Sequence, residues 1–301
     1  MNFLTEVLPD KFVEMFLQTA VGYSLTGFTG EHCLFLLHGH GRNGKSVFIN
    51  TIQYLLGDYA MQADWQSFSS RKSGQAEIRE DIARLEGARF VAAIESEQNI
   101  RLAENVIKAI TGGDRITARH LYKGSFEFYP QFKLWLATNH LPKIIGTDDG
   151  IWSRIMKIPF TVTIPKEKRD TGLTEKLKQE APGILNWALA GLKTYLQTGL
   201  VAPEAVRKST DVYRDESDVM NRFLVATCIF QDDAEVSTTT LYQRYRRWCD
   251  EVGETYVMSE HEFRQSLDVR GLQRQHKRAG AVWIGLALTQ EPIKPGQYAL
   301  N

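Results

Sequence analysis

The residues best suited to chemistry form one short segment of the chain, Gly39-His40-Gly41-Arg42-Asn43-Gly44-Lys45-Ser46. It satisfies every fixed position of the phosphate-binding pattern G-x-x-x-x-G-K-[ST]. Glycines let such a loop curl so that backbone N–H groups point at phosphate oxygens, and the following helix adds its positive dipole end. The lysine reaches the β- and γ-phosphates, and the serine hydroxyl ligates Mg²⁺. The segment therefore predicts binding of a nucleoside triphosphate, with Lys45 and Ser46 in these roles.

Two carboxylates follow a buried strand further along the chain. Residues 89–94 read R-F-V-A-A-I and lead directly into Glu95-Ser96-Glu97. A carboxylate at the carboxyl end of a core strand can hold the Mg²⁺ water shell or polarise the attacking water. If the strand continues, its period of two places Glu95 and Glu97 on one face. The sequence pattern does not decide which of the two carboxylates holds the Mg²⁺ water shell and which polarises the water. For each of them the alternative is an ordinary carboxylate at a solvated strand end.

A neutral amide and an arginine complete the candidate catalytic set. Asn139 ends the apolar run 132–138, where an amide can orient the attacking water or contact the γ-phosphate without adding charge. A turn-initiating asparagine is the alternative. Arg154 ends the stretch G-I-W-S-R, and an arginine offered to a neighbouring subunit's γ-phosphate would complete that site in trans. Its alternative is a surface salt bridge.

The elements that must position these residues alternate between strand and helix. Apolar runs with both faces hydrophobic indicate buried parallel strands. We expect strands at 33–37, 89–94 and 132–137, and helices at 47–56 and 102–110. This alternation predicts an α/β fold with a mainly parallel sheet.

Helices are expected on both sides of this core. Residues 10–22 show helical spacing of apolar residues, with Phe12 on the predicted buried face. Residues 172–230 are also predicted to be helical, with Leu185 and Leu189 on one apolar face. In the last 70 residues, two helices followed by a hairpin suggest a winged helix. The predicted divisions are an N-terminal helical segment (1–32), a P-loop core (33–165), a helical linker (166–230) and a winged-helix-like domain (231–301).

Composition limits how the chain could meet a nucleic acid. Its 301 residues carry 36 Lys+Arg and 36 Asp+Glu, so binding to DNA would need local basic clusters. One is the predicted hairpin 115–128, with Lys123 at its tip and Arg119 and His120 nearby; a solvated hairpin is the alternative. The other is the tail, where subunit packing or partner docking is the alternative to DNA binding. Its basic residues are Arg264, Arg270, Arg274, Lys277 and Arg278.

Several classes of protein do not fit the sequence. No apolar run reaches the roughly 18 residues of a membrane span, and the start lacks the features of a secretory signal. The three cysteines form no zinc-binding pattern and are expected to be reduced, packed thiols. We therefore expect a cytoplasmic protein without a membrane partner; if it is encoded by a phage or plasmid, the compartment is the bacterial host cytoplasm.

The order of motifs resembles that of superfamily 3 DNA helicases. The resemblance is to the C-terminal half of phage- and plasmid-type primase–helicases, and to the poxvirus helicase–primase. It covers about residues 20–160, and L-Y-Q-R-Y-R-R-W-C (241–249) is similar to the winged-helix tail of the same proteins. The matching stretches are 39–46, A-A-I-E-S-E (92–97), K-A-I-T-G-G-D-R-I-T-A-R-H-L-Y (108–122), F-E-F-Y-P-Q-F-K-L-W-L-A-T-N-H-L-P (126–142) and G-I-W-S-R-I (150–155).

This resemblance implies an AAA+-like ATPase that forms a homo-hexameric ring and translocates on single-stranded or forked DNA, usually 3′ to 5′. ATP with Mg²⁺ would lie between subunits, with Asn139 as sensor and Arg154 as finger. The hairpin would grip DNA in the central channel, and a primase or polymerase is an expected partner. Many members have two adjacent acids at the strand end, whereas this chain has Ser96 between Glu95 and Glu97.

Two other functions remain open at this point. A P-loop phosphotransferase would act as a monomer, and its ATPase activity would ignore DNA. A nucleotide-switched DNA-binding regulator would hydrolyse ATP negligibly and would not displace a DNA strand.

Overall fold

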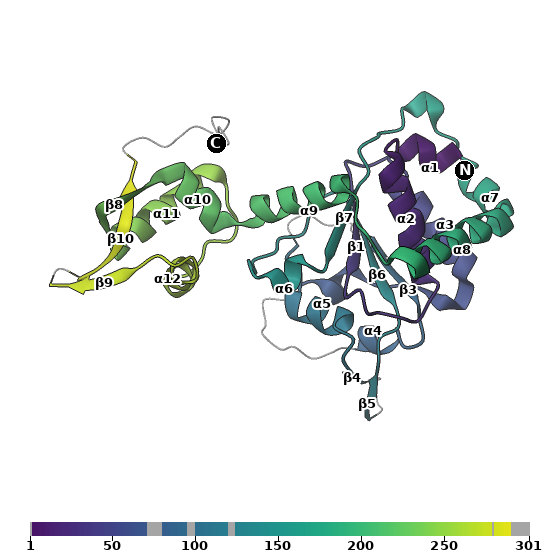
Figure 1. Cartoon of the computed structure of the whole chain (residues 1–301), viewed down its shortest axis with the longest axis horizontal. Coiled ribbons are helices and arrows are strands. Elements are labelled where there is room, and N and C mark those ends of the chain that lie inside the picture. The colour runs from purple at the N-terminus through teal and green to yellow at the C-terminus, as the bar shows by residue number, and fades with distance from the viewer. Residues whose placement is uncertain (1, 71–79, 95–99, 120–123, 279, 290–301) are drawn as a thin grey trace. The chain divides into compact units, whose positions relative to one another are not determined.

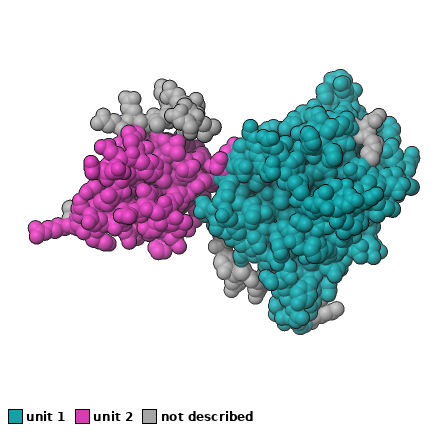
Figure 2. Space-filling view, viewed as in Figure 1, with its two compact units in different colours: residues 1–214 teal, residues 215–301 magenta. Residues whose placement is uncertain are grey.

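The computed structural model describes residues 2–70, 80–94, 100–119, 124–278 and 280–289. Two compact units make up the chain, Met1–Arg214 and Asp215–Asn301 (Figures 1 and 2). No helix in the described ranges combines the length and the apolar character that crossing a bilayer requires.

The first unit contains the five-stranded sheet that positions the candidate site. All four strand pairings are parallel, which confirms the predicted α/β class with a mainly parallel sheet. The spatial order is β2 (Ala60–Gln62), β3 (Phe90–Ile94), β6 (Lys133–Thr138), β1 (Leu34–His38) and β7 (Ile155–Pro159). Of these, β2 and β7 were not predicted: β2 has only three residues, and the β7 sequence I-M-K-I-P contains a lysine and a proline.

Helices cover both faces of this sheet, because successive strand residues point to opposite sides. On β1, Phe35 and Leu37 join one apolar core, whereas Leu34 and Leu36 join the other. The first core is closed by α1 (Asn2–Val7), α2 (Lys11–Ser24), α3 (Lys45–Leu56) and α8 (Ala181–Thr198), and α7 (Leu173–Gln179) contacts α3 and α8. The second is closed by α4 (Glu80–Ala83), α5 (Glu104–Thr111) and α6 (Asp149–Trp152), with Tyr213 of α9 (Glu204–Ser217). Short 3₁₀ helices lie at Gly57–Tyr59, Trp65–Phe68 and Lys166–Lys168.

The flanking helices bury different residues from those predicted. Helix α8 packs on α2 through glycines: a Cβ on Gly22 would lie 2.0 Å from the backbone nitrogen of Leu192. Because α8 turns Trp187, Ala188, Gly191 and Tyr195 inward, Leu185 and Leu189 are 41% and 46% exposed. Phe12, at the start of α2, is 71% exposed. The predicted apolar faces were therefore wrong at these positions, and α1 and α2 share one compact unit with the sheet.

The second unit begins earlier than the predicted boundary at residue 231. Helix α10 (Val219–Thr227) belongs to this unit, because the Phe223 ring contacts the rings of Tyr245, Trp248 and Phe263. The predicted pair of helices followed by a hairpin is confirmed, and the antiparallel sheet has the order β8-β10-β9. The remaining elements are β8 (Cys228–Ser237), α11 (Thr238–Val252), α12 (Glu260–Val269), β9 (Arg274–Lys277) and β10 (Gly280–Leu288).

Candidate nucleotide site

The phosphate-loop segment lies between a core strand and a helix, as its pattern requires. Strand β1 ends at His38, and α3 begins at Lys45. Gly41 and Gly44 have positive φ angles of 91° and 86°, which glycine adopts without steric cost. Gly44 caps α3 without a side-chain hydrogen bond to its first turn. The amides of that turn can therefore donate to an anion.

Lys45 is held at the centre of this segment by three oxygen atoms. Its side chain is only 5% exposed, and its Nζ donates to the Gly39 carbonyl at 2.7 Å. The other two acceptors are the Oδ1 atoms of Asn43 and Asn139, each at 3.0 Å. The lysine thus joins the loop to the end of strand β6. A triphosphate oxygen would take the place of one or more of these acceptors.

Asn43 fixes the loop to the neighbouring strand segment. It is 2% exposed, and its Nδ2 donates to the carbonyl of Phe160, just after β7, at 3.1 Å. A Cβ on Gly39 would lie 2.2 Å from this amide nitrogen, so the glycine is needed for the close approach. The sequence pattern gave no signal for this role, because the position of Asn43 in the motif accepts any residue.

Burial lowers the pKa of two basic groups at the loop, Lys45 and His38. Loss of solvation lowers the pKa of Lys45 to about 8, so the ammonium form predominates at pH 7. Burial, followed by the positive charge of Lys157, lowers the pKa of His38 to about 4. His38 is therefore neutral at pH 7, and Lys45 supplies the charge at the centre of the site.

A cavity of about 210 Å³ opens above the loop at the carboxyl end of the sheet. Asn139 lines it beside Lys45, so the structure brings together two residues that are 94 positions apart in the sequence. Ser46 and Arg42 also line the cavity and are exposed. Ile94, the last residue of β3, reaches the same cavity, and Glu95 and Glu97 lie outside the described residues.

Arg154 lies at the opposite end of the sheet from Lys45. Its carbonyl accepts a hydrogen bond from Leu34 N, at the amino end of β1, at 2.7 Å. Its side chain is half-buried and donates to the Gly150 carbonyl. With β1 spanning five residues, the two ends of the strand are about 13 Å apart. Arg154 is therefore not in the cavity that contains Lys45 of its own chain.

The predicted hairpin is confirmed as β4 (Ile116–Arg119) paired with β5 (Ser125–Phe128) (Figure 1). Arg119 is exposed at its outer end, whereas His120 and Lys123 lie outside the described residues. The positive charge of this region is smaller than the sequence suggested. Lys108 pairs with Asp148 at 2.9 Å, and Arg115 pairs with Glu127 at 3.0 Å.

Acidic partners also offset the positive charge of the tail, residues 264–278. Arg270 pairs with Asp218, Lys277 with Glu235, and Arg264 approaches Glu260 at 4.0 Å. Arg274 and Arg278 are exposed. On α11, Tyr245 and Trp248 are buried at 0% and 5% exposure, so these aromatic residues form core rather than a base-stacking surface.

Comparisons with known proteins agree with this arrangement. Residues 37–154 match a family of unknown function (DUF5906), and residues 215–275 match the Poxvirus D5 protein-like family. A protein of Acanthamoeba polyphaga mimivirus named as a candidate helicase (L207/L206) is 31% identical over 266 residues, which cover 82% of this chain and 28% of that protein. A candidate helicase of frog virus 3 (022R) is 27% identical, covering 82% of this chain and 27% of that protein.

The fold is shared with a solved structure, the apo form of the NrS-1 C-terminal region. The two are 10% identical with a TM-score of 0.55, over 95% of this chain and 74% of that one. The chain spans less than a third of the length of the two viral relatives. The viral relatives and the D5-like match support a poxvirus-like helicase–primase family for this chain, and the solved structure shows a shared fold.

Proposed function

We propose that this chain is the motor part of an ATP-dependent DNA helicase used in replication of the phage, plasmid or viral type. The observation that carries the proposal is the bonded network of Lys45, Gly39, Asn43 and Asn139 at the carboxyl end of a parallel sheet. The network places a lysine, a curled glycine loop, a helix start and a neutral amide around one cavity. This is the combination that a triphosphate requires.

In the proposed reaction, the loop 39–46 binds the phosphates of ATP and Lys45 neutralises their charge. No group of three or more His, Cys, Asp or Glu in the described ranges could hold a metal ion. Ser46, which lines the cavity, and the predicted group Glu95 would hold an Mg²⁺ brought in with the nucleotide, and the ion would neutralise phosphate charge. Water attacks the γ-phosphorus, the bond to the β–γ bridging oxygen breaks, and Glu95 or Glu97 accepts the proton. Asn139 contacts the γ-phosphate.

The position of Arg154 supports a site shared between copies. Because Arg154 lies at the amino end of the sheet, it can approach a γ-phosphate only in a neighbouring chain. We therefore propose an AAA+-like core assembled as a homo-hexameric ring, with each ATP at a seam between two chains. A finger arginine of this kind stabilises charge in the transition state of phosphoryl transfer.

Two surfaces are proposed to meet DNA. The hairpin of β4 and β5 would contact the backbone of the threaded strand through Lys123, Arg119 and His120. In the second unit, the element order helix, strand, two helices and two strands supports a winged helix that could contact the duplex or pack against a partner. Binding through phosphates would be independent of sequence and sensitive to salt. A primase or polymerase elsewhere in the replication machinery is the proposed partner.

Strand displacement on a forked DNA with ATP and Mg²⁺ tests the proposal. We expect displacement by the wild-type chain and none by Lys45→Ala, with the exposed substitution Lys193→Ala as the matched control. Hydrolysis that ignores DNA would instead favour the phosphotransferase. DNA binding without hydrolysis would favour the nucleotide-switched regulator.

A further inference from the structure

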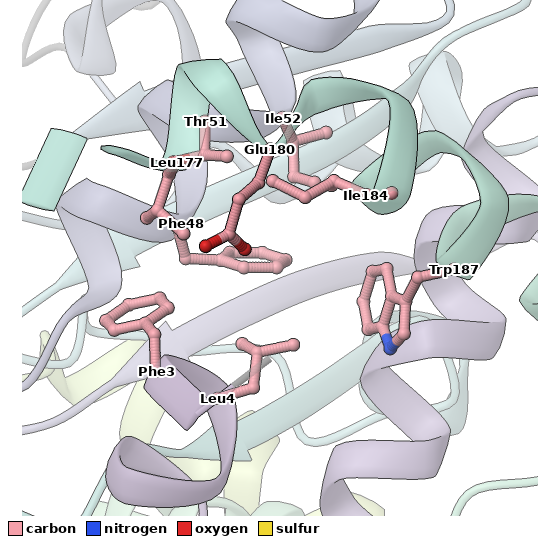
Figure 3. A pocket seen from close by; sticks show the side chains of 10 residues that line it. Phe3, Leu4, Phe48, Thr51, Ile52, Leu177, Glu180, Ile184 and Trp187 are labelled. Atoms are coloured by element: carbon pink, nitrogen blue, oxygen red, sulfur yellow. The ribbon is translucent and has the colours of Figure 1, made fainter. Parts of the chain in front are cut away.

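The phosphate loop has different neighbours on the two faces of the sheet. On one face, an apolar cavity of about 280 Å³ is lined by residues of α1, α3 and the range 177–187 (Figure 3). On the other face, the segment 139–154 packs into the second core through α6. This segment begins at Asn139, which is proposed to contact the γ-phosphate of its own chain, and ends at Arg154, which is proposed to contact that of the neighbour. It therefore connects two successive ATP sites of the proposed ring.

The loop that precedes α6 in this segment is tied to α5 and to α6. The Glu104 carboxylate, at the start of α5, accepts hydrogen bonds from the backbone N–H groups of Ile145 and Gly146, both at 2.9 Å. The Trp152 indole of α6 donates to the Gly146 carbonyl at 2.8 Å. Because energetic coupling travels through packed and hydrogen-bonded groups, the loop and α6 can transmit a displacement from one end of the segment to the other.

Tyr213 of α9 contacts the segment near both of its ends. Its hydroxyl donates to the Pro142 carbonyl, three residues after Asn139. Its ring lies edge-on to the ring of Trp152, with 5.1 Å between the ring centres, two residues before Arg154. Tyr213 is 2% exposed, so both contacts are made in the core. A single buried side chain therefore bridges the end that contacts one nucleotide and the end that contacts the next.

Arg154 is held within its own chain by the same helix that Tyr213 contacts. Its guanidinium donates to the carbonyl of Gly150, and both Gly150 and Trp152 belong to α6. Arg154 must leave this carbonyl to reach a γ-phosphate in a neighbouring chain. The position of α6 therefore controls whether the arginine is held or released.

We propose that Tyr213 couples neighbouring ATP sites by keeping Arg154 on α6 until the chain's own site has bound ATP. The inference rests on the proposed function and extends it to the control of one site by the next. When the γ-phosphate draws Asn139 toward it, the Pro142 carbonyl is displaced as well, because the proline ring fixes the backbone there. The Tyr213 hydroxyl bond is then lost, α6 shifts, and Arg154 is released. Tyr213 contacts no nucleotide in this scheme and is a positioning residue.

The test uses mixtures of two variants, in which the intact phosphate loop and the intact arginine come from different chains. Arg154→Ala supplies the loop, and Lys45→Ala supplies the arginine from a chain without a γ-phosphate to draw Asn139. Adding Tyr213→Phe to the Lys45→Ala chain removes the hydroxyl bond and keeps the ring. Because this bond stabilises only the held arrangement, its loss shifts the population toward release. Phosphate release by the mixture should rise about fivefold, the shift expected for one hydrogen bond.

Two controls separate coupling from a general effect on folding or catalysis. Tyr213→Phe placed in the Arg154→Ala chain instead should give no rise, because that chain offers no arginine, and the activity of this mixture shows that the substituted chain is folded. Tyr23→Phe in the Lys45→Ala chain should also give no rise. It removes another buried hydroxyl, which accepts a hydrogen bond from the backbone N–H of Glu31 at 3.4 Å.

The inference is overturned if Tyr213→Phe in the Lys45→Ala chain leaves phosphate release unchanged or lowers it. An equal rise with the substitution in either chain also overturns it, because the effect would not depend on which chain offers the arginine. The mixture without Tyr213→Phe distinguishes this failure from that of the proposed function. If that mixture releases no more phosphate than the separate variants, the shared seam itself fails, and the coupling fails with it.

Discussion

The two ends of the parallel sheet each hold a buried lysine, and the surroundings of these lysines differ. At the carboxyl end, Lys45 is 5% exposed and lines a cavity beside a curled loop. At the amino end, Lys133 is 2% exposed and donates to the carbonyl groups of Thr26 and Gln131, with its Nζ 4.7 Å from the centre of the Tyr23 ring. Burial of a lysine alone therefore does not mark a ligand site. The adjoining cavity and the free helix start distinguish Lys45.

Arg154 is predicted to contact the nucleotide, yet it lies at the amino end of the sheet, on the same side as Lys133. It is therefore the second residue on which the two ends of the sheet can be compared. Its Nε is buried without a hydrogen-bond partner among the described residues. Its role toward the nucleotide of a second copy of the chain is therefore a proposal that the variants below test. The following variants test whether the carboxyl end alone binds the nucleotide and whether the amino end contributes across an interface.

The largest effect is expected for Lys45→Ala. The variant removes the charge that neutralises the phosphates, so turnover of ATP should fall to background in a phosphate-release assay. Lys133→Met is the control, since it removes a buried lysine from the other end of the sheet. Normal turnover by Lys45→Ala would show that the nucleotide site is elsewhere.

Arg154→Ala should reduce turnover about 1,000-fold, the order of magnitude associated with an arginine finger. If the arginine acts in trans, mixing this variant with Lys45→Ala should restore part of the activity, because mixed seams contain an intact loop and an intact finger. The measurement is phosphate release across a series of mixing ratios. Activity that stays at the level of the separate variants would argue against a shared seam.

Asn139→Ala is expected to have an intermediate effect, with turnover reduced by about 100-fold, as for loss of a single polar contact to a developing charge. The variant also removes one of the three acceptors of the buried Lys45 ammonium, so the midpoint of denaturant unfolding should decrease slightly. Steady-state kinetics should show the loss mainly in kcat. A change confined to KM would instead assign Asn139 to ground-state binding.

Lys133→Met is expected to have the smallest effect on ATP turnover and the clearest effect on the free energy of unfolding. Burial lowers the pKa of Lys133 to about 7, whereas an unfolded lysine titrates near 10.5. Between these values the unfolded state binds more protons, so the free energy of unfolding rises with pH by up to about 1.4 kcal/mol per unit. Lys133→Met should lose this contribution. Urea unfolding at pH 7 and pH 9 measures it, and equal pH dependence in the two proteins would refute the assignment.

Much of the carboxyl end was predictable from the sequence. The strand before the loop and the helix after it follow from local apolar patterns, and residues 39–46 follow from the chemistry of phosphate binding. Asn139 was identified from its place at a strand end, and the parallel sheet brings it to Lys45. These predictions depend on patterns that are local in the sequence.

The remaining features depend on tertiary packing, which local patterns do not encode. Helix α8 is apolar on more than one face, so its sequence could not show that Trp187 rather than Leu189 is buried. The position of Arg154 at the opposite end follows from the unpredicted strand β7. Counting charges along the sequence overestimated the net positive charge of the tail. Lys277 on β9 is paired with Glu235, which is far away in the sequence and lies on β8 of the same sheet.

The most direct test of the central claim is the structure of the full chain with single-stranded DNA, Mg²⁺ and a non-hydrolysable ATP analogue, determined by electron cryomicroscopy. The account predicts the triphosphate in the loop 39–46, with the Lys45 ammonium on its phosphate oxygens and Arg154 of a neighbouring chain facing the γ-phosphate. A nucleotide bound elsewhere, or a lone chain with Lys45 still donating to the Gly39 carbonyl, would contradict it.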